Sequence, residues 1–309
     1  MNAVTAHKIR KTFPAKGKPT VALETISFEV GQGELFGIIG PDGAGKTTLF
    51  RILTTLMLAD EGTASVDGLD VVKDFKEIRK RVGYMPGKFS LYPDLSVEEN
   101  LRFFATLFST SIEENYDLVK DIYVQIEKFK KRKAGALSGG MKQKLALSCA
   151  LIHKPSVLFL DEPTTGVDAV SRKEFWELLR NLQGQGITIV VSTPYMDEAS
   201  LCDRVALVQE GRIMDIDSPK GIVDKFGSTL WSVKADRMYE LMKALREMED
   251  VASCYPFGQE HHVVFKDETA SPEKVKRSLM DQGFADFKFH PIEASIEDCF
   301  MKLMTSHNA

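Results

Sequence analysis

Short apolar runs alternate with longer segments whose apolar residues recur every three or four positions through the first two thirds of the chain. Short apolar runs are typical of strands buried in a sheet, and the wider spacing is typical of amphipathic helices. The alternation favours an α/β fold in which helices cover a largely parallel sheet. The expected strands are Leu35–Ile39, Val157–Leu160, Ile187–Ser192 and Val205–Gln209, the last followed by a turn at Glu210-Gly211.

Two helical regions interrupt these strands. Lys46–Leu56 contains neither Gly nor Pro and predicts a helix after the Gly-rich segment that follows the first strand. Between Ser96 and Leu151 the pattern becomes mostly helical. The apolar residues that recur there at three- and four-residue steps are Val97, Leu101, Phe104, Ala105 and Phe108. We therefore expect a helical subdomain, at about residues 88–151, inserted into the α/β domain.

The last third of the chain predicts a different order of elements, which is typical of a small α+β domain of the split βαβ kind. The expected strand, helix, strand, strand, helix and strand are Thr229–Lys234, Met238–Met248, Val251–Pro256, His261–Lys266, Pro272–Gln282 and Asp286–His290. A final amphipathic helix is expected at Ser295–Met304. The sequence thus predicts an α/β domain over residues 1–223 and a C-terminal α+β domain, βαββαβ-like, over residues 224–309.

Size and composition agree with two folded domains. The chain has 309 residues, more than a single domain usually holds, with 43% hydrophobic and 27% charged side chains. Its 40 basic and 44 acidic residues give a formal net charge of −4, which lacks the strong positive field that binds a nucleic-acid backbone. Nucleic acid is therefore not expected as a main partner.

The cysteines and the hydropathy pattern indicate the expected cellular setting. Cys149, Cys202, Cys254 and Cys299 lie far apart, without the close pairs of a zinc site or a redox motif, so we expect them in the core of a cytosolic protein. Met1–Phe13 lacks the apolar segment of a signal peptide. No run approaches the roughly 18 apolar residues that span a bilayer. Any role at a membrane is therefore expected to depend on a partner.

The Gly-rich segment between the first expected strand and helix predicts a phosphate-binding loop. It reads Gly40, Pro41, Asp42, Gly43, Ala44, Gly45, Lys46 and Thr47, followed by Thr48. Glycines let successive backbone N–H groups close around phosphate oxygens, and the helix N-terminus adds its dipole. Lys46 would reach the terminal phosphates, and Thr47 would offer its hydroxyl to Mg²⁺. A plain Gly-rich turn is the alternative, but the full pattern between a strand and a helix favours nucleotide binding.

Two carboxylates follow the apolar strand Val157–Leu160. Asp161 and Glu162 would stand at the carboxyl end of that strand, where α/β sheets bind ligands. Asp161 suits the magnesium shell, and Glu162 could polarise the attacking water as the catalytic residue. Alone, acids after an apolar strand are as often a solvent-facing strand end. Behind a phosphate-binding loop they favour phosphoryl transfer to water.

A third motif lies between the other two along the chain. It reads Leu137, Ser138, Gly139, Gly140, Met141, Lys142 and Gln143. Ser138 and the two glycine amides would stand where a helix begins, so they form either a simple helix cap or a second anion-binding surface. With this motif added, the chain resembles the ATP-binding subunit of an ABC transporter over roughly residues 4–223.

This resemblance implies an ABC-type P-loop NTPase core, ATP and Mg²⁺ as cofactors, and two subunits that sandwich two ATP molecules head to tail. The third motif is the family's signature motif, which faces the nucleotide of the opposing subunit. Phe13 looks like the aromatic residue that stacks on adenine, although a Phe near a strand otherwise belongs to the core. Thr165–Asp168 looks like the loop that contacts the opposite subunit, and Lys88–Ala105 like the segment that meets the membrane subunits.

The tail of the chain narrows the resemblance. Ile292–Phe300 is similar to the closing motif of ATPases that drive ABC-2 exporters. That similarity implies ABC-2-type transmembrane permease subunits as partners. It also implies a cytoplasmic protein that is peripheral on the inner face of the cell membrane.

Three residues depart from the family pattern at its chemical centre. The family usually has a glutamine where Gly87 stands, which contacts magnesium, and a histidine where Pro194 stands, which hydrogen-bonds the terminal phosphate. Glycine has no side chain, and proline has neither an imidazole nor a backbone donor. Asp42 stands where asparagine is common and adds a negative charge near a triphosphate. We therefore expect a degenerate site beside a complete signature motif.

The sequence-based hypothesis is a weakly hydrolysing ATP-binding subunit of an ABC exporter that pairs with a second, non-identical ATPase half. In this respect it resembles the degenerate first half of tandem-fused export ATPases. The alternative is a regulatory pseudo-ATPase that binds ATP without useful hydrolysis. A non-transport ABC protein acting on DNA or ribosomes is disfavoured by the acidic balance, the single signature and the exporter-like tail.

Overall fold

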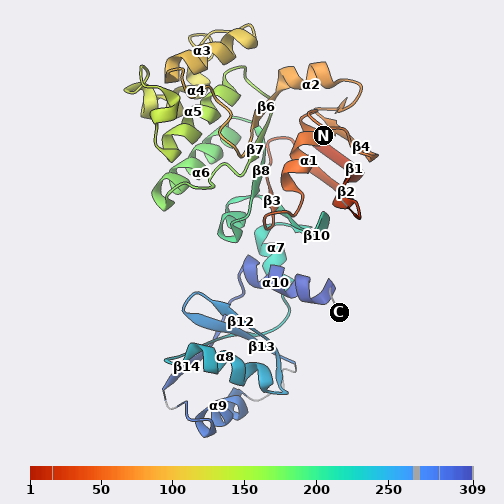
Figure 1. The fold of residues 1–309 in the computed structure, drawn as a ribbon, viewed down its shortest axis with the longest axis vertical. Coiled ribbons are helices and arrows are strands. Elements are labelled where there is room, and N and C mark those ends of the chain that lie inside the picture. Colours follow the sequence, from red (N-terminus) through yellow and green to blue (C-terminus); the bar gives the residue numbers. More distant parts are fainter. Residues whose placement is uncertain (16, 267–271, 285, 308–309) are drawn as a thin grey trace. The chain divides into compact units, whose positions relative to one another are not determined.

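The computed structural model describes the whole chain except residues 16, 267–271, 285 and 308–309. The chain divides into two compact units, Met1–Pro219 and Lys220–Ala309 (Figure 1). This division lies four residues before the boundary expected at 223/224 (223 − 219 = 4). The α/β class with a small α+β unit is the class expected from the sequence.

A six-stranded sheet forms the centre of the first unit. Its strand order is β10-β9-β3-β8-β7-β6, and all neighbours are parallel except β10, which pairs with β9 in the antiparallel sense. The bounds are β3 Leu35–Ile39, β6 Val82–Met85, β7 Val157–Asp161, β8 Thr188–Thr193, β9 Arg204–Gln209 and β10 Arg212–Asp217. Every residue of β3, β7 and β8 is buried, which explains why these strands read as continuous apolar runs. The four strands expected from those runs are confirmed within two residues at each end.

A second, antiparallel sheet of the first unit was not distinguished by the sequence pattern. Its order is β2-β1-β4-β5, with bounds β1 Asn2–Phe13, β2 Thr20–Gly31, β4 Glu61–Val66 and β5 Leu69–Asp70. Only four of the twelve residues of β1 are buried, so this strand lacks the unbroken apolar runs of the central sheet. Ile9 and Leu23 of this sheet join Phe50 and Phe159 in one hydrophobic core.

The first helix, α1 (Lys46–Leu53), is shorter than the expected Lys46–Leu56. Thr54 caps it, Thr55 adopts a positive φ of 63°, and the N–H of Leu56 bonds back to the carbonyl of Arg51. The absence of Gly and Pro was therefore a misleading signal, because a threonine takes the left-handed position that usually ends a helix at Gly. The remaining helical elements of this part of the unit are α2 Phe75–Arg81, α6 Ala169–Gly184 and the short 3₁₀ helix η2 Met196–Leu201.

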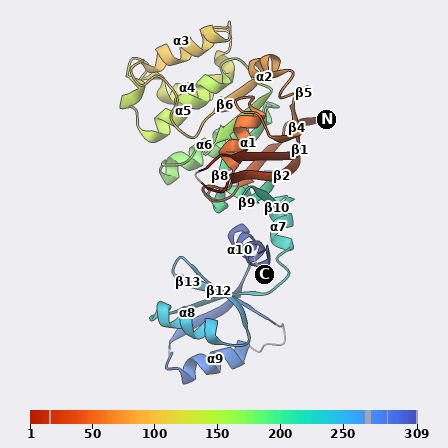
Figure 2. The same ribbon diagram turned by 45° about the vertical axis from the view of Figure 1, so that its right-hand side comes forward.

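The expected helical subdomain is present as a group of helices between β6 and β7 (Figures 1 and 2). It consists of α3 Val97–Leu107, α4 Tyr116–Glu127, the 3₁₀ turn η1 Ala134–Ala136 and α5 Gly139–Leu151. A capping box starts α3, since the Ser96 hydroxyl accepts from Glu99 N–H and the Glu99 carboxylate accepts from Ser96 N–H. No described helix has the length and apolarity needed to cross a membrane.

The second unit contains the four-stranded antiparallel sheet β12-β13-β11-β14. Its bounds are β11 Leu230–Ala235, α8 Met238–Glu247, β12 Val251–Phe257, β13 Glu260–Phe265, α9 Pro272–Asp281, β14 Phe287–Ile292 and α10 Ile296–His307, after α7 Pro219–Asp224 at the boundary. The βαββαβ order is therefore confirmed. Leu241 and Leu279, from α8 and α9, pack with Val263 on one face of the sheet.

All four cysteines are buried, as expected of core residues. Burial raises the pKa of the Cys149 and Cys202 thiols, and it raises that of Cys254 to about 11. Thiols with raised pKa values hold little thiolate near neutral pH and are poor nucleophiles. The cysteines therefore contribute packing to both units.

Candidate nucleotide-binding site

The loop between β3 and α1 is held so closely by neighbouring strands that two of its positions accept only glycine. A Cβ atom on Gly40 would lie 2.1 Å from the carbonyl oxygen of Val208, and Gly40 N–H donates to Thr193 O at 3.3 Å. Gly45, the N-cap of α1, has a φ of +99°, and a Cβ there would lie 2.4 Å from the carbonyl oxygen of Ala22. The loop is thus fixed over the carboxyl ends of the central strands, with the N-terminus of α1 directed at it.

The buried side chain of Lys46 places its ammonium at the centre of this loop. Its Nζ lies 2.8 Å from Gly40 O and 3.0 Å from Pro41 O, and it forms an ion pair with Glu162 Oε1 at 3.1 Å. Only 3% of the Lys46 side chain is exposed. A cation at this depth stabilises negative charge more strongly than one at the surface, because water screens it less.

The two carboxylates predicted from the sequence lie at the same edge of the sheet. Asp161 is buried at the end of β7, and its Oδ1 accepts a hydrogen bond from Ser192 Oγ at 2.7 Å. Glu162 has a φ of +50°, and its N–H donates to Ser192 O at 3.0 Å and to Ser192 Oγ at 3.1 Å. Ser192 is a residue that the motif analysis did not identify as part of the site. It joins the carboxylates because β7 and β8 are parallel neighbours.

These groups fit a magnesium nucleotide. Magnesium prefers hard oxygen ligands, and Asp161 and the Thr47 hydroxyl at the start of α1 supply them. The charge of Asp161 also acts on a neighbour: burial first, and then this carboxylate, raises the pKa of Tyr84 to about 12. The donor set and the Lys46 ammonium therefore have the chemistry that a triphosphate with its metal ion requires.

Gly87, Pro194 and Asp42, the three departures noted in the sequence, all lie at this site. A Cβ atom on Gly87 would be 3.0 Å from the carbonyl oxygen of Asp161 and 3.8 Å from Glu162 Cβ. Pro194 follows Thr193, whose carbonyl accepts from Gly40 N–H. Asp42 is exposed on the loop. Positions 87 and 194 therefore lie beside the carboxylates and the loop.

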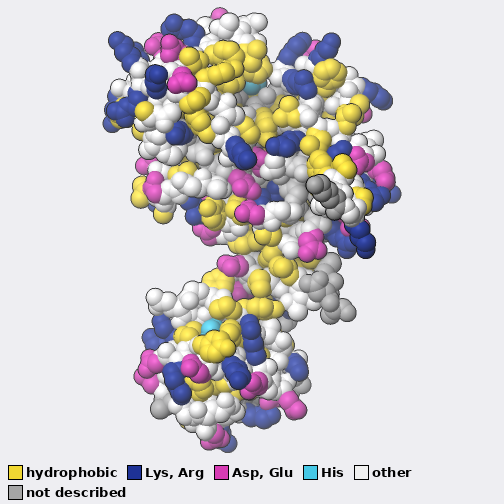
Figure 3. All heavy atoms as spheres, in the orientation of Figure 1, with side chains coloured by type: hydrophobic (Ala, Val, Ile, Leu, Met, Phe, Trp, Pro, Cys, Tyr) yellow, Lys and Arg dark blue, Asp and Glu magenta, His cyan; other side chains and the backbone are white. Residues whose placement is uncertain are grey.

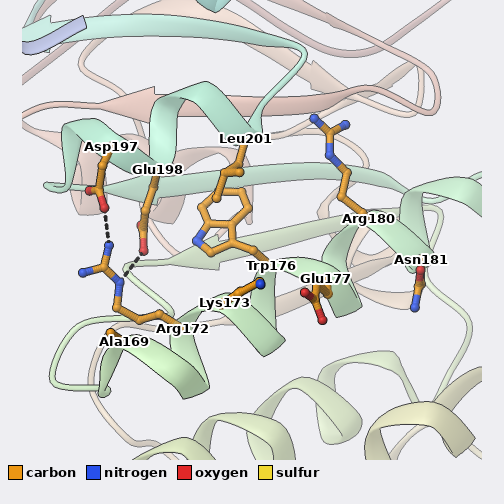
Figure 4. Close-up of a pocket in the computed structure, with 10 residues that line it drawn as sticks. All are labelled: Ala169, Arg172, Lys173, Trp176, Glu177, Arg180, Asn181, Asp197, Glu198 and Leu201. Atoms are coloured by element: carbon orange, nitrogen blue, oxygen red, sulfur yellow. Dashed lines mark hydrogen bonds and ion pairs between the residues drawn. The ribbon is translucent and has the colours of Figure 1, made fainter. Parts of the chain in front are cut away.

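The buried Glu198 of η2 pairs with Arg172 of α6 (Figure 4). It also bonds to the loop after β7 and to the end of β8. Glu198 Oε2 accepts from Thr193 Oγ1 at 2.5 Å and from Thr164 Oγ1 at 3.1 Å, and Glu198 Oε1 accepts from Arg172 Nε at 3.1 Å. Arg172 also pairs with Asp197 at 2.9 Å. Sequence reasoning missed Glu198 and Arg172, because 26 residues separate them and neither belongs to a short motif.

The signature motif starts α5 at a different place in the first unit. Ser138 is the N-cap, and its hydroxyl accepts from Met141 N–H at 3.4 Å. A Cβ on Gly140 would lie 2.8 Å from Ser171 Oγ, which shows how closely the start of α5 approaches α6. Leu137 is buried and Gln143 partly buried. Within the described residues, no hydrogen bond or ion pair joins residues 137–143 to the phosphate-binding loop.

Asp168 caps the N-terminus of α6, next to the start of α5. Its Oδ1 accepts from Val170 N–H at 3.1 Å and from Ser171 N–H at 3.0 Å. The bond from Ser171 N–H is the main reason why the pKa of Asp168 lies below its usual value. The carboxylate therefore holds the loop of residues 165–168 at the helix start.

Phe13, the candidate adenine-stacking residue, ends β1 and pairs with Thr20 of β2. Its ring is partly buried, and Lys11 Nζ lies 5.8 Å from the ring centroid. Ala22 of β2 contacts the Gly45 position of the loop, so the end of β1 is one strand away from that loop. An aromatic ring there is in the right part of the unit to meet a base.

Comparisons with known proteins agree with these features. The ABC transporter family pattern matches residues 23–165. The chain is 36% identical over 305 residues to "Probable multidrug ABC transporter ATP-binding protein YbhF" of Escherichia coli (strain K12), covering 97% of this chain and 52% of that protein. The chain therefore spans about half the length of YbhF.

Two other relatives match nearly end to end. The daunorubicin resistance ATP-binding protein DrrA2 of Streptomyces coeruleorubidus is 34% identical over 321 residues, with 99% of this chain and 95% of that protein covered. The Nod factor export ATP-binding protein I of Burkholderia lata is 42% identical over 289 residues, with 90% of each covered.

Solved structures show the same fold. One is the dimeric post-hydrolysis state of the ATP-binding cassette MJ0796 bound to ADP and Pi, with a TM-score of 0.64 and 26% identity over 70% of this chain and 98% of that chain. Another is cbiO1 from Clostridium perfringens, part of the ABC transporter complex cbiONQ, with a TM-score of 0.64 and 27% identity over 73% of this chain and 92% of that chain.

Proposed function

This chain belongs to the ATP-binding proteins of ABC transporters, and we propose that it is the ATP-binding subunit of an exporter. The names of its relatives support export, since they include multidrug, drug-resistance and Nod factor export proteins. The geometry that carries the proposal is the convergence of Lys46, Asp161 and Glu162 on one glycine-rich loop. The reaction is the transfer of the terminal phosphoryl group of ATP to water.

Each residue of the site has a defined task in this proposal. The loop N–H groups and Lys46 bind the phosphates, while Thr47 and Asp161 hold Mg²⁺. Bound Mg²⁺ would neutralise charge on the phosphate oxygens. Glu162 orients and polarises the water, from a backbone position fixed by Ser192. Phe13 stacks on the adenine.

The experiment that tests ATP binding is calorimetric titration of Mg-ATP into the wild-type chain and Lys46→Ala. We expect the variant to lose saturable binding, because the buried ammonium that faces the phosphates is gone. Lys243→Ala is the matched control, since the Lys243 side chain is 68% exposed in the second unit. Wild-type affinity in Lys46→Ala would place the nucleotide elsewhere.

We also propose that this chain hydrolyses ATP weakly at its own site. The support is the position of Gly87 beside both carboxylates and of Pro194 beside the loop, where neither offers a side-chain donor. Loss of one transition-state donor typically lowers the rate about 10²- to 10³-fold. Asp42 adds negative charge at the exposed rim of the loop.

The signature motif serves a second ATPase half in this proposal. Ser138, Gly139 and Gly140 present N–H groups at the start of α5 and have no bonds to the chain's own phosphate loop within the described residues. MJ0796, which shares the fold, is dimeric when bound to ADP and Pi. A non-identical partner, with an intact site of its own, would use the complete signature of this chain.

The membrane subunits would dock on an apolar pocket of about 490 Å³ beside the helical subdomain. Met85, Leu91, Phe104, Leu107 and His153 are among the residues that line it. Hydrophobic side chains gather beside α3 on this face of the first unit (Figure 3). Leu107 is 62% exposed, which is unusual for a large apolar side chain unless a partner covers it. Such docking would hold the chain at the inner face of the membrane.

The alternative function is a regulatory pseudo-ATPase, which the same Gly87 and Pro194 positions favour. In that case the chain closes on ATP and signals to its partner without turnover. Glu162 argues against it, because a carboxylate beside Lys46 is the group that hydrolysis needs. Turnover of the reconstituted pair distinguishes the two functions.

A further inference from the structure

The second unit contains a pocket of about 380 Å³ that has no part in nucleotide binding. His262 and Val264 of β13 line it, whereas Val263 between them packs in the core with α8 and α9. Because successive side chains of a strand point to opposite faces, the pocket lies on the other face of the sheet, under α10. Its apolar wall consists of Phe226, Leu230, Pro256, Phe257, Val264 and Met301.

A buried pair of ionisable side chains forms the polar part of this pocket. His262 Nδ1 lies 2.6 Å from Asp298 Oδ1, and the two side chains are 8% and 6% exposed. Asp298 Oδ2 accepts from Ser295 N–H at 2.8 Å and from Ser295 Oγ at 2.6 Å. A carboxylate that accepts all these bonds needs a proton on Nδ1, so the Asp298 side chain fixes the tautomer of His262.

The other nitrogen of His262 is open to the pocket. The Phe257 ring stacks on the imidazole with centroids 4.1 Å apart, which holds the ring in place. Within the described residues, no protein group forms a hydrogen bond with Nε2. This nitrogen is also accessible to solvent.

The charges around the pocket limit the chemistry of its occupant. Glu297 and Asp298 both line it, so an anionic group next to His262 would meet two carboxylates. Lys302 also lines the pocket, where its ammonium donates to Phe226 O and Ser228 Oγ. With Nδ1–H directed at Asp298, the tautomer that carries this single proton presents a lone pair on Nε2, which accepts a hydrogen bond from a hydroxyl group.

We propose that this pocket binds a small hydroxylated aromatic compound. The aromatic body packs among Phe226, Phe257 and Met301, and the hydroxyl donates a hydrogen bond to Nε2 of His262. The volume of the pocket, its ring-lined wall and the open Nε2 of His262 match the usual features of small-molecule sites. This site belongs to the second unit alone and does not depend on the function proposed for the first.

The experiment compares two probes of nearly equal shape on the full chain. 2-Naphthol can donate a hydrogen bond to His262, and 2-fluoronaphthalene cannot. Binding is measured by equilibrium dialysis up to the solubility limit of each probe. We expect 2-naphthol to saturate one site, with an affinity about tenfold higher than that of 2-fluoronaphthalene, the value of one hydrogen bond in an apolar site. Equal affinities, or no saturable binding of 2-naphthol, would overturn the proposal.

Three variants locate the probe. Met301→Trp should abolish 2-naphthol binding by filling the pocket, whereas Met280→Trp, at a side chain 58% exposed on α9, should leave it unchanged. His262→Phe keeps a ring under Phe257 and should reduce the affinity for 2-naphthol to that for 2-fluoronaphthalene. Unchanged binding in Met301→Trp contradicts the location. Lys46→Ala should retain 2-naphthol binding, and loss there would show that the probe occupies the nucleotide site.

Discussion

Restoring the two missing side chains tests most directly whether the nucleotide site is degenerate. The double variant Gly87→Gln with Pro194→His places an amide beside Asp161 and Glu162 and an imidazole beside the loop. The glutamine Cβ would lie 3.0 Å from the carbonyl oxygen of Asp161, so the backbone must give by a few tenths of an ångström. We put this cost at about 1 kcal/mol, the low end of overpacking, with about 0.4–1 kcal/mol more for the lost proline.

The expected decrease in activation free energy is larger than this loss in the free energy of unfolding. One restored transition-state contact is worth about 10²-fold in turnover, or about 2.7 kcal/mol of activation free energy. The two groups would act on one phosphate, so their effects need not add. We therefore expect the double variant to hydrolyse ATP at least about 10²-fold faster than wild type, while its melting temperature falls by a few degrees.

The assay is steady-state phosphate release, with thermal unfolding measured on the same samples. Adding Glu162→Gln should cancel the gain, because the water would lose its base. If the double variant folds and binds ATP like wild type but turns over no faster, the missing side chains do not limit hydrolysis. The degenerate-site proposal would then be wrong.

Three further predictions concern the partner surfaces and acid stability. Ser138→Arg should block turnover of the reconstituted pair of ATPase halves while calorimetry shows that this chain still binds ATP; undiminished turnover would show that the partner does not use the signature surface. Leu107→Asp should abolish co-purification with the membrane subunits, whereas Met280→Asp, also at an exposed apolar side chain, should not; retention by Leu107→Asp would move the docking surface. Burial alone would raise the pKa of Asp203, but bonds from Leu35 N–H, Arg180 and Gln183 outweigh it and hold that pKa below 3.8. The carboxylate therefore stabilises the fold fully above about pH 4 and loses this effect as the pH falls further. In urea unfolding at a series of pH values, Asp203→Asn should lose less stability on acidification than wild type. An unchanged dependence of the free energy of unfolding on pH would contradict this assignment.

The prediction of the candidate nucleotide site rests on short motifs. The phosphate loop, the acidic strand end and the signature each consist of neighbouring residues, whose backbone geometry follows from local residue types. The central strands were predictable because both faces of a parallel sheet are buried, which leaves continuous apolar runs such as Leu35–Ile39. The end of α1 was not predictable in this way, because Thr55 takes a backbone conformation that its residue type does not announce.

The sequence by itself determined which chemical groups this protein has, including Gly87 and Pro194 at two positions of the candidate site. Only the tertiary structure decided which groups meet. Ser192 joins Asp161 because two strands pair in parallel, and Glu198 joins Arg172 because η2 lies beside α6. His262 meets Asp298 across 36 residues because α10 covers the sheet. Such contacts depend on strand register and helix packing, which no single stretch of sequence encodes.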